Sequence, residues 1–140
     1  MLNFVMSKSL YIYNYFKAKK CLIKKDFLCA YENFVKAEKY NDKDYSLYIY
    51  KGISEFFLKE FESSLYTLQR ALLMIESDKK LNKDEKNYLK KYLFGFIIDI
   101  LKILNKEESL NEYLKIYKKL KFDRKNINKN FFYDYPLESD

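Results

Sequence analysis

The side chains that most often carry out catalysis or bind metals are sparse in this 140-residue chain. There is no histidine, and Cys21 and Cys29 lie eight residues apart without a second cysteine pair, so zinc-ligand spacing is absent. Ser63 and Ser64 have no base near them in sequence, and no glycine-rich phosphate loop is present. We therefore predict no enzyme, no metal and no cofactor. Both cysteines are expected to be free thiols in a reducing compartment.

A pattern of small and large apolar residues recurs with a period of 34 residues. The first copy is Ala18, Phe27, Ala30, Phe34 and Ala37, and the second is Gly52, Phe61, Ser64, Leu68 and Ala71. Self-similarity at this period is typical of stacked helix–turn–helix units. Small residues let two helices approach closely, and large ones fill the space between them. Gly52 inside a helix costs about 1 kcal/mol relative to Ala, which is tolerated where packing requires it.

This pattern resembles the tetratricopeptide repeat over about half of the chain. The second unit matches the family at Tyr48, Gly52, Phe61, Ser64, Leu68, Ala71 and Leu72. The first unit departs at Asn14 and Lys17, where the family prefers Trp and Leu, and neither unit has the closing proline. The resemblance implies an all-α, right-handed solenoid of about three antiparallel helix pairs that binds other proteins.

We expect the helical repeat domain to cover residues 1–122, with an irregular tail at 123–140. Its units are predicted at about 11–44, 45–78 and 84–122, the last being degenerate, with Gly95 in the role of Gly52. Alternatively, the two helices of residues 84–122 form a separate hairpin that does not stack on the first two units as a third repeat. Five helices are predicted at about 9–23, 27–40, 45–58, 61–76 and 84–104, and a sixth follows the capping box at residues 105–108 and ends at about 122.

Capping residues mark several of these boundaries. Asp26 and Asp44 are predicted N-caps, and Asn105 with Glu108 has the spacing of a capping box. The last helix has one apolar stripe on an otherwise polar surface, which suits the end of a repeat array. Residues 123–130 are polar and expected to be flexible. The aromatic segment 131–137 is expected to dock in extended form, on its own chain or on a neighbouring copy.

The resemblance implies that the first helix of each unit lines a concave groove. The candidate peptide-binding residues are Tyr15, Lys19, Ile49, Ile53, Phe56, Phe57, Tyr92 and Phe96. With Gly95 aligned to Gly52, the third unit also contributes Asp99 and Ile100. This surface suits a peptide with apolar or aromatic anchors; alternatively, some of these residues pack between helices. The predicted function is a non-enzymatic adaptor or small chaperone, or a self-assembling homodimer whose tail fills a neighbour's groove.

Residues 115–129 contribute six of the seven net positive charges. The basic strip comprises Lys115, Lys118, Lys119, Lys121, Arg124 and Lys125. Such a strip binds nucleic acid or an anionic surface, or else it is the solvated face of the last helix. A coding sequence rich in A and T also produces this lysine content. Without a signal peptide or a segment long enough to span a membrane, the chain is predicted to be cytoplasmic.

Overall fold

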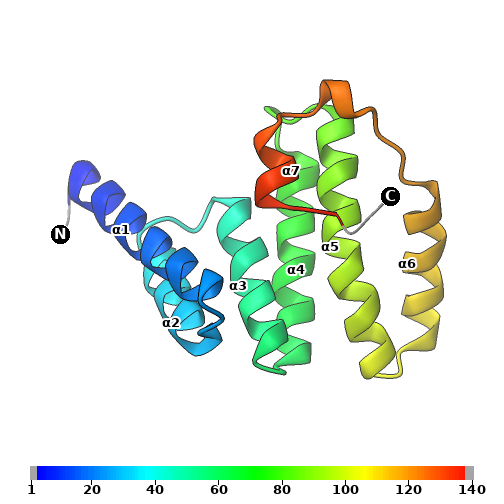
Figure 1. Ribbon diagram of the computed structural model, residues 1–140, viewed down its shortest axis with the longest axis horizontal. Coiled ribbons are helices and arrows are strands. Elements are labelled where there is room, and N and C mark those ends of the chain that lie inside the picture. Colours follow the sequence, from blue (N-terminus) through cyan, green and yellow to red (C-terminus); the bar gives the residue numbers. More distant parts are fainter. Residues whose placement is uncertain (1–2, 138–140) are drawn as a thin grey trace. The chain divides into compact units, whose positions relative to one another are not determined.

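The structure is a computed structural model that describes residues 3–137 (Figure 1). Within them the chain is all-helical, with seven α-helices packed in sequential pairs and no strand. The elements are α1 (Phe4–Ile23), α2 (Phe27–Glu38), α3 (Tyr45–Phe57), α4 (Phe61–Ser77), α5 (Lys83–Ile103), α6 (Glu107–Lys119), the short 3-10 helix η1 (Arg124–Asn126) and α7 (Asn130–Asp134). The six predicted helices are therefore present. The first begins earlier than expected because the Asn3 side chain caps it by accepting the Met6 N–H.

The chain divides into two compact units, residues 1–71 and residues 72–140. Unit 1 contains α1, α2, α3 and the first part of α4. Unit 2 contains the last residues of α4 and all elements from α5 to α7. Each unit is described separately below.

Three turns between paired helices share one backbone geometry. Lys25, Lys59 and Asn105 have φ angles of 62°, 65° and 56°, in the left-handed region. In each turn the next residue donates its N–H to the carbonyl five residues earlier. These bonds are Asp26 to Cys21 (2.9 Å), Glu60 to Glu55 (2.9 Å) and Lys106 to Leu101 (3.0 Å). This pattern terminates helices by pairing carbonyls that the helix leaves free. Equivalent positions in the three hairpins can therefore be counted from the turn residue.

Small residues allow close helix packing in unit 1, as the repeat predicted. Ala18 and Gly52 both lie seven residues before the turn residue, and both are buried. A Cβ atom added at Gly52 would lie 2.6 Å from Cδ2 of Leu68, closer than carbon atoms pack. The Ser64 hydroxyl also donates a 2.7 Å hydrogen bond to the Gly52 carbonyl. The prediction that Gly52 marks a close approach of two helices is confirmed.

The predicted equivalence of Gly95 with Gly52 is wrong. Gly95 is exposed, and a Cβ atom added there would meet no atom within 4 Å. Counted from Asn105, the position of Gly52 is occupied by Ile98, which is buried. At this position the third hairpin therefore packs a large side chain where the first two pack small ones.

The N-caps at Asp26 and Asp44 are confirmed, because their carboxylates accept the N–H groups of Cys29 and Ser46. The predicted capping box at Asn105 is wrong. Asn105 is the left-handed turn residue, and the N-cap of α6 is Lys106, which makes no side-chain capping bond. The capping box lies instead at the start of α5, where Asn82 and Glu85 exchange hydrogen bonds of 2.8 and 3.1 Å.

The segment after α6 is not the flexible linker and extended tail that we predicted. Ile127 is buried, and the Asn128 N–H donates to the Glu85 carboxylate at 3.0 Å. The aromatic segment then forms the helix α7, and Phe131 and Tyr135 are buried. Since the Tyr88 hydroxyl on α5 donates to the Tyr135 carbonyl at 2.7 Å, the segment docks on its own chain. Residues 138–140 of the predicted tail lie outside the described residues.

The prediction of free cysteines is also wrong, because Cys21 and Cys29 form a disulfide. Cys21 lies in the last turn of α1 and Cys29 in the first turn of α2, and the hairpin places their Cα atoms 5.8 Å apart. That separation is within the range that a disulfide spans. The argument from free thiols for a reducing compartment therefore loses its basis. Among residues 3–137, no helix is long and apolar enough to cross a membrane.

Candidate functional site

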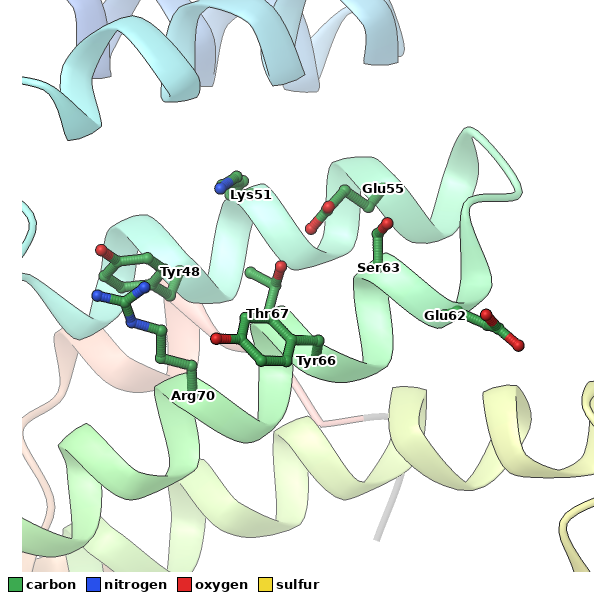
Figure 2. Close-up of a pocket in the computed structure, with 8 residues that line it drawn as sticks. All are labelled: Tyr48, Lys51, Glu55, Glu62, Ser63, Tyr66, Thr67 and Arg70. Atoms are coloured by element: carbon green, nitrogen blue, oxygen red, sulfur yellow. The ribbon is translucent and has the colours of Figure 1, made fainter.

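A polar pocket of about 370 Å³ lies between α3 and α4 in unit 1 (Figure 2). Its walls are Tyr48, Lys51 and Glu55 from α3, and Glu62, Ser63, Tyr66, Thr67 and Arg70 from α4. Along each helix these residues are spaced three or four apart, apart from two adjacent pairs on α4, which places them on one face. The close approach of the two helices at Gly52 brings these faces together.

Glu55 is the unusual residue of this pocket. Its side chain is only 5% exposed, and its Oε1 atom has no hydrogen-bond partner among residues 3–137. Figure 2 shows the carboxyl group directed between Lys51 and Thr67. A buried acceptor without a partner costs about 1–3 kcal/mol. Glu55 therefore occupies a position that does not favour folding, which is a recurring property of functional sites.

Burial is the main reason that the pKa of Glu55 lies above its ordinary value. The Thr67 hydroxyl, which hydrogen-bonds the carboxyl group, and the Lys51 ammonium both lower this pKa. Glu38 and Glu60 raise it, because their negative charges disfavour ionisation of a third carboxyl group nearby. Together with Glu62 and Arg70, which line the same pocket, the surroundings of Glu55 thus hold three carboxylates and two cations.

Both cations at the pocket interact with other groups. The Lys51 ammonium donates to the Glu38 carboxylate at 2.8 Å, and the Arg70 guanidinium lies 4.6 Å from the centre of the Tyr48 ring. The Tyr48 hydroxyl donates to Glu38 at 3.0 Å. Burial, followed by the charge of Glu38, raises the pKa of Tyr48 to about 12. One wall of the pocket is therefore a connected polar network, and Glu55 faces the remaining space.

The predicted groove residues of unit 1 fall into two groups. Ile49 and Ile53 are buried and offer no surface to a peptide. Tyr15 and Lys19 are half-buried: the Tyr15 hydroxyl shares a 3.0 Å hydrogen bond with Ser46, and the Lys19 ammonium lies 5.0 Å from the Tyr50 ring centre. The first two residues thus serve the core, and the other two lie at its edge.

Phe56 and Phe57 belong to an aromatic cluster at the end of α3. Phe57 stacks on Phe27 with a ring-centre distance of 4.6 Å, and Phe56 contacts Phe57 edge to face at 5.2 Å. Phe56 is half-buried, whereas Phe57 is 47% exposed. The cluster therefore presents one aromatic face to solvent.

The position of Phe57 has an exposed apolar residue in all three hairpins. Ile23, Phe57 and Ile103 each lie two residues before the left-handed turn residue, and their side chains are 79%, 47% and 49% exposed. The glycine-based alignment had placed Ile100 in the third groove, but Ile100 is fully buried. Only the turn geometry identifies Ile103 as the equivalent residue.

Tyr92 and Phe96 lie beside a second pocket of about 750 Å³, which is confined to unit 2. Its lining comes from α5, α6 and the segment after α7, and it includes Asp99, which is exposed. The Tyr92 ring contacts the Tyr135 ring edge to face at 5.6 Å. The C-terminal segment therefore covers part of the surface that we had assigned to peptide binding.

The basic strip is exposed along α6, the following segment and η1. Arg124 and Lys125 interact locally, since the Arg124 guanidinium lies 5.1 Å from the Phe132 ring centre and Lys125 pairs with Asp123 at 3.6 Å. The other four residues are Lys115, Lys118, Lys119 and Lys121, all of them exposed. Among residues 3–137, no group of three or more metal-ligating side chains is present.

Sequence reasoning missed the polar pocket between α3 and α4. One signal was available, because Glu55 is the one charged residue in the stretch from Gly52 to Leu58, whose other residues are apolar except for Ser54. Glu55 is buried because α4 packs against α3. The sequence pattern predicted that these two helices pack together, but it did not show which polar residues of α3 would become buried. No known protein family, curated protein or solved structure matches this chain.

Proposed function

We propose that this chain is a non-enzymatic protein-binding module built on tetratricopeptide-like helical repeats. It holds a peptide segment with apolar or aromatic anchors. The repeat assignment is supported by the shared turn geometry at Lys25, Lys59 and Asn105, and by the buried small residues of the first two hairpins. Arrays of this kind are binding scaffolds whose stability is a sum over stacked units.

The observation that carries the proposal is the exposed apolar residue at one equivalent position of every hairpin. Ile23, Phe57 and Ile103 are surface residues where a polar side chain would be cheaper to solvate. A single exposed apolar residue is common on any protein, but the same choice at three equivalent positions indicates a role in binding. The tail of a second copy is not required, since this segment docks on its own chain.

Selection from a random peptide library displayed on phage, with the full chain as bait, tests this proposal. We expect the selected peptides to carry Phe, Leu or Ile anchors. The substitution Phe57→Ser should weaken their binding at least tenfold, because aromatic anchors often dominate binding energies. Since Phe57 also stacks on Phe27, the variant Ile23→Ser provides a second test that removes no ring contact.

The matched control is Leu73→Ser, which removes an exposed leucine that is not at the repeated position. Circular dichroism checks that each variant keeps its helices. Peptides that bind Phe57→Ser and Ile23→Ser as tightly as the parent chain would contradict the proposal. Enrichment of acidic peptides that bind through the basic strip would contradict it as well.

A further inference from the structure

We propose that the pocket between α3 and α4 binds the ammonium group of a lysine side chain presented by a partner protein, with Glu55 as its counter-ion. The inference rests on the proposed function, which supplies a peptide partner, but it uses a different surface of unit 1. It assigns a second, charged anchor to a ligand otherwise recognised by apolar contacts.

The first argument is the unpartnered oxygen of Glu55. Oε1 is buried and has no hydrogen-bond partner in the part of the chain that the structure describes, although Glu55 lines an open pocket. An ionised carboxylate is purely an acceptor, so only a donor can complete its hydrogen bonding. An ammonium group supplies up to three donors and a charge of the opposite sign.

The second argument is the balance of charge around Glu55. Glu38 and Glu60 act on it with negative charge and Lys51 with positive charge, while Arg70, the other cation of the pocket, lies against the Tyr48 ring. Lys51 is already paired with Glu38 at 2.8 Å. A ligand that brings a positive charge therefore relieves repulsion, whereas a ligand carboxylate or phosphate would add to it.

The third argument is the shape and lining of the pocket. Its volume of about 370 Å³ is sufficient for a single long side chain. Ser63 and Thr67 contribute hydroxyl oxygens that can accept hydrogen bonds from the remaining N–H groups of the ammonium. The Tyr66 ring is largely exposed at the pocket, where it can cover an alkyl chain or face the cation.

A short peptide tests this inference without the apolar anchors. The probe is acetyl-Gly-Gly-Lys-Gly-Gly-amide, titrated into the ¹⁵N-labelled full chain and followed by amide chemical shifts. We expect shifts at residues 51–70 that saturate, and no such shifts with the same peptide carrying norleucine instead of lysine. Glu55→Gln should weaken the binding at least tenfold, because it removes the counter-ion and keeps the size of the side chain.

Glu32→Gln is the matched control, because it removes one exposed carboxylate from unit 1 at a site away from the pocket. Its affinity for the lysine peptide should equal that of the parent chain. Phe57→Ser should also leave this affinity unchanged, which separates failure of the pocket from failure of the apolar surface. Equal binding of lysine and norleucine peptides, or full binding by Glu55→Gln, would overturn the inference.

The pH dependence of the parent chain provides a test that needs no variant. Binding of the lysine peptide should weaken on acidification, because Glu55 takes up a proton and loses its charge. The other charged groups around Glu55 are Glu38 from α2, Lys51 from α3, Glu60 just before α4, and Glu62 and Arg70 from α4. Binding that is constant down to pH 4 would overturn the assignment of Glu55. Tighter binding of butane-1,4-diamine than of the lysine peptide would overturn the assignment to a protein partner.

Discussion

The two units of this protein bury their apolar surface in different ways around the same turn. In unit 1, Ala18 and Gly52 permit close helix packing, and eight of the 13 residues of α3 are buried. In unit 2, the equivalent position holds Ile98, and α6 contributes no buried residue. The missing cover is supplied by the C-terminal segment, whose residues Phe131 and Tyr135 are buried in unit 2.

This difference shows that the backbone turn, and not the small residue, defines equivalence between the hairpins. All three turns have a left-handed residue, followed by a residue whose N–H donates to the carbonyl five residues earlier, although the side chains of the three turns differ. A hairpin that keeps the turn but loses its small residues still requires a packed face. Phe132 of α7 and Tyr135, which follows this helix, provide the packed face through ring contacts with Tyr88 and Tyr92.

The largest expected effect is that of truncating the chain after Asn130. This removes two buried aromatic side chains, each of which contributes about 1.5–3 kcal/mol when fully buried. We expect the free energy of unfolding of unit 2 to fall by about 3–6 kcal/mol. Native-state hydrogen exchange should show loss of protection in α5 and little change in α1 and α2.

Tyr133→Ser is the control for the truncation, because this side chain is almost fully exposed. It should leave the exchange rates of α5 unchanged. If α5 kept its protection after truncation, the C-terminal segment would not be part of the core of unit 2, and the contrast between the units would disappear.

The next largest effect is that alanine substitutions at the two glycines should change the free energy of unfolding in opposite directions. Gly52→Ala places a Cβ atom 2.6 Å from Leu68, and overpacking of this kind destabilises by about 1–3 kcal/mol. Gly95→Ala meets no neighbouring atom and should stabilise by about 1 kcal/mol, since alanine favours the helix. Urea unfolding of both variants measures this difference, and equal effects would show that the two positions are equivalent after all.

A smaller effect concerns Glu55, whose carboxyl group is buried, whereas Asp99 at the pocket of unit 2 is exposed. Because the folded state raises its pKa, the protonated form stabilises the fold below the pKa of the unfolded chain. This stabilisation is lost as the pH rises through the folded-state pKa. At neutral pH, Glu55→Gln should therefore stabilise the chain, because it removes a negative charge that burial disfavours.

Chemical unfolding from pH 4 to pH 7 checks this sign. The stability of the parent chain relative to Glu55→Gln should fall as the pH rises, while Glu32→Gln should follow the parent at every pH. A difference between the parent and Glu55→Gln that grows in the opposite direction would mean that the folded state favours the ionised form.

The smallest effect is expected at the turns. Lys25 and Lys59 adopt left-handed φ angles that disfavour a side chain, so Lys25→Gly and Lys59→Gly should each stabilise by about 0.5–1 kcal/mol. Asn105→Gly should gain less, because asparagine tolerates this conformation. Thermal unfolding measures all three, and destabilisation by these glycines would argue against a shared turn geometry.

The sequence by itself determined the helices and the close contact at Gly52. Both depend on local interactions: the caps at Asp26 and Asp44 bond to residues two or three positions later, and the period of 34 places small residues on facing helices. These features require no knowledge of which other elements pack nearby, so the pattern was sufficient to predict them.

Only the tertiary structure decided the disulfide, the burial of Glu55, the exposure of Gly95 and the position of the C-terminal segment. Each depends on which surfaces of separate elements meet. The Cys21–Cys29 disulfide forms because the hairpin of α1 and α2 brings the two Cα atoms within 5.8 Å. The hydrogen bond between Tyr88 and Tyr135 joins residues that are 47 positions apart in the sequence. A sequence pattern reports what each residue prefers, whereas burial and pairing are set by neighbours that are distant in sequence and close only after folding.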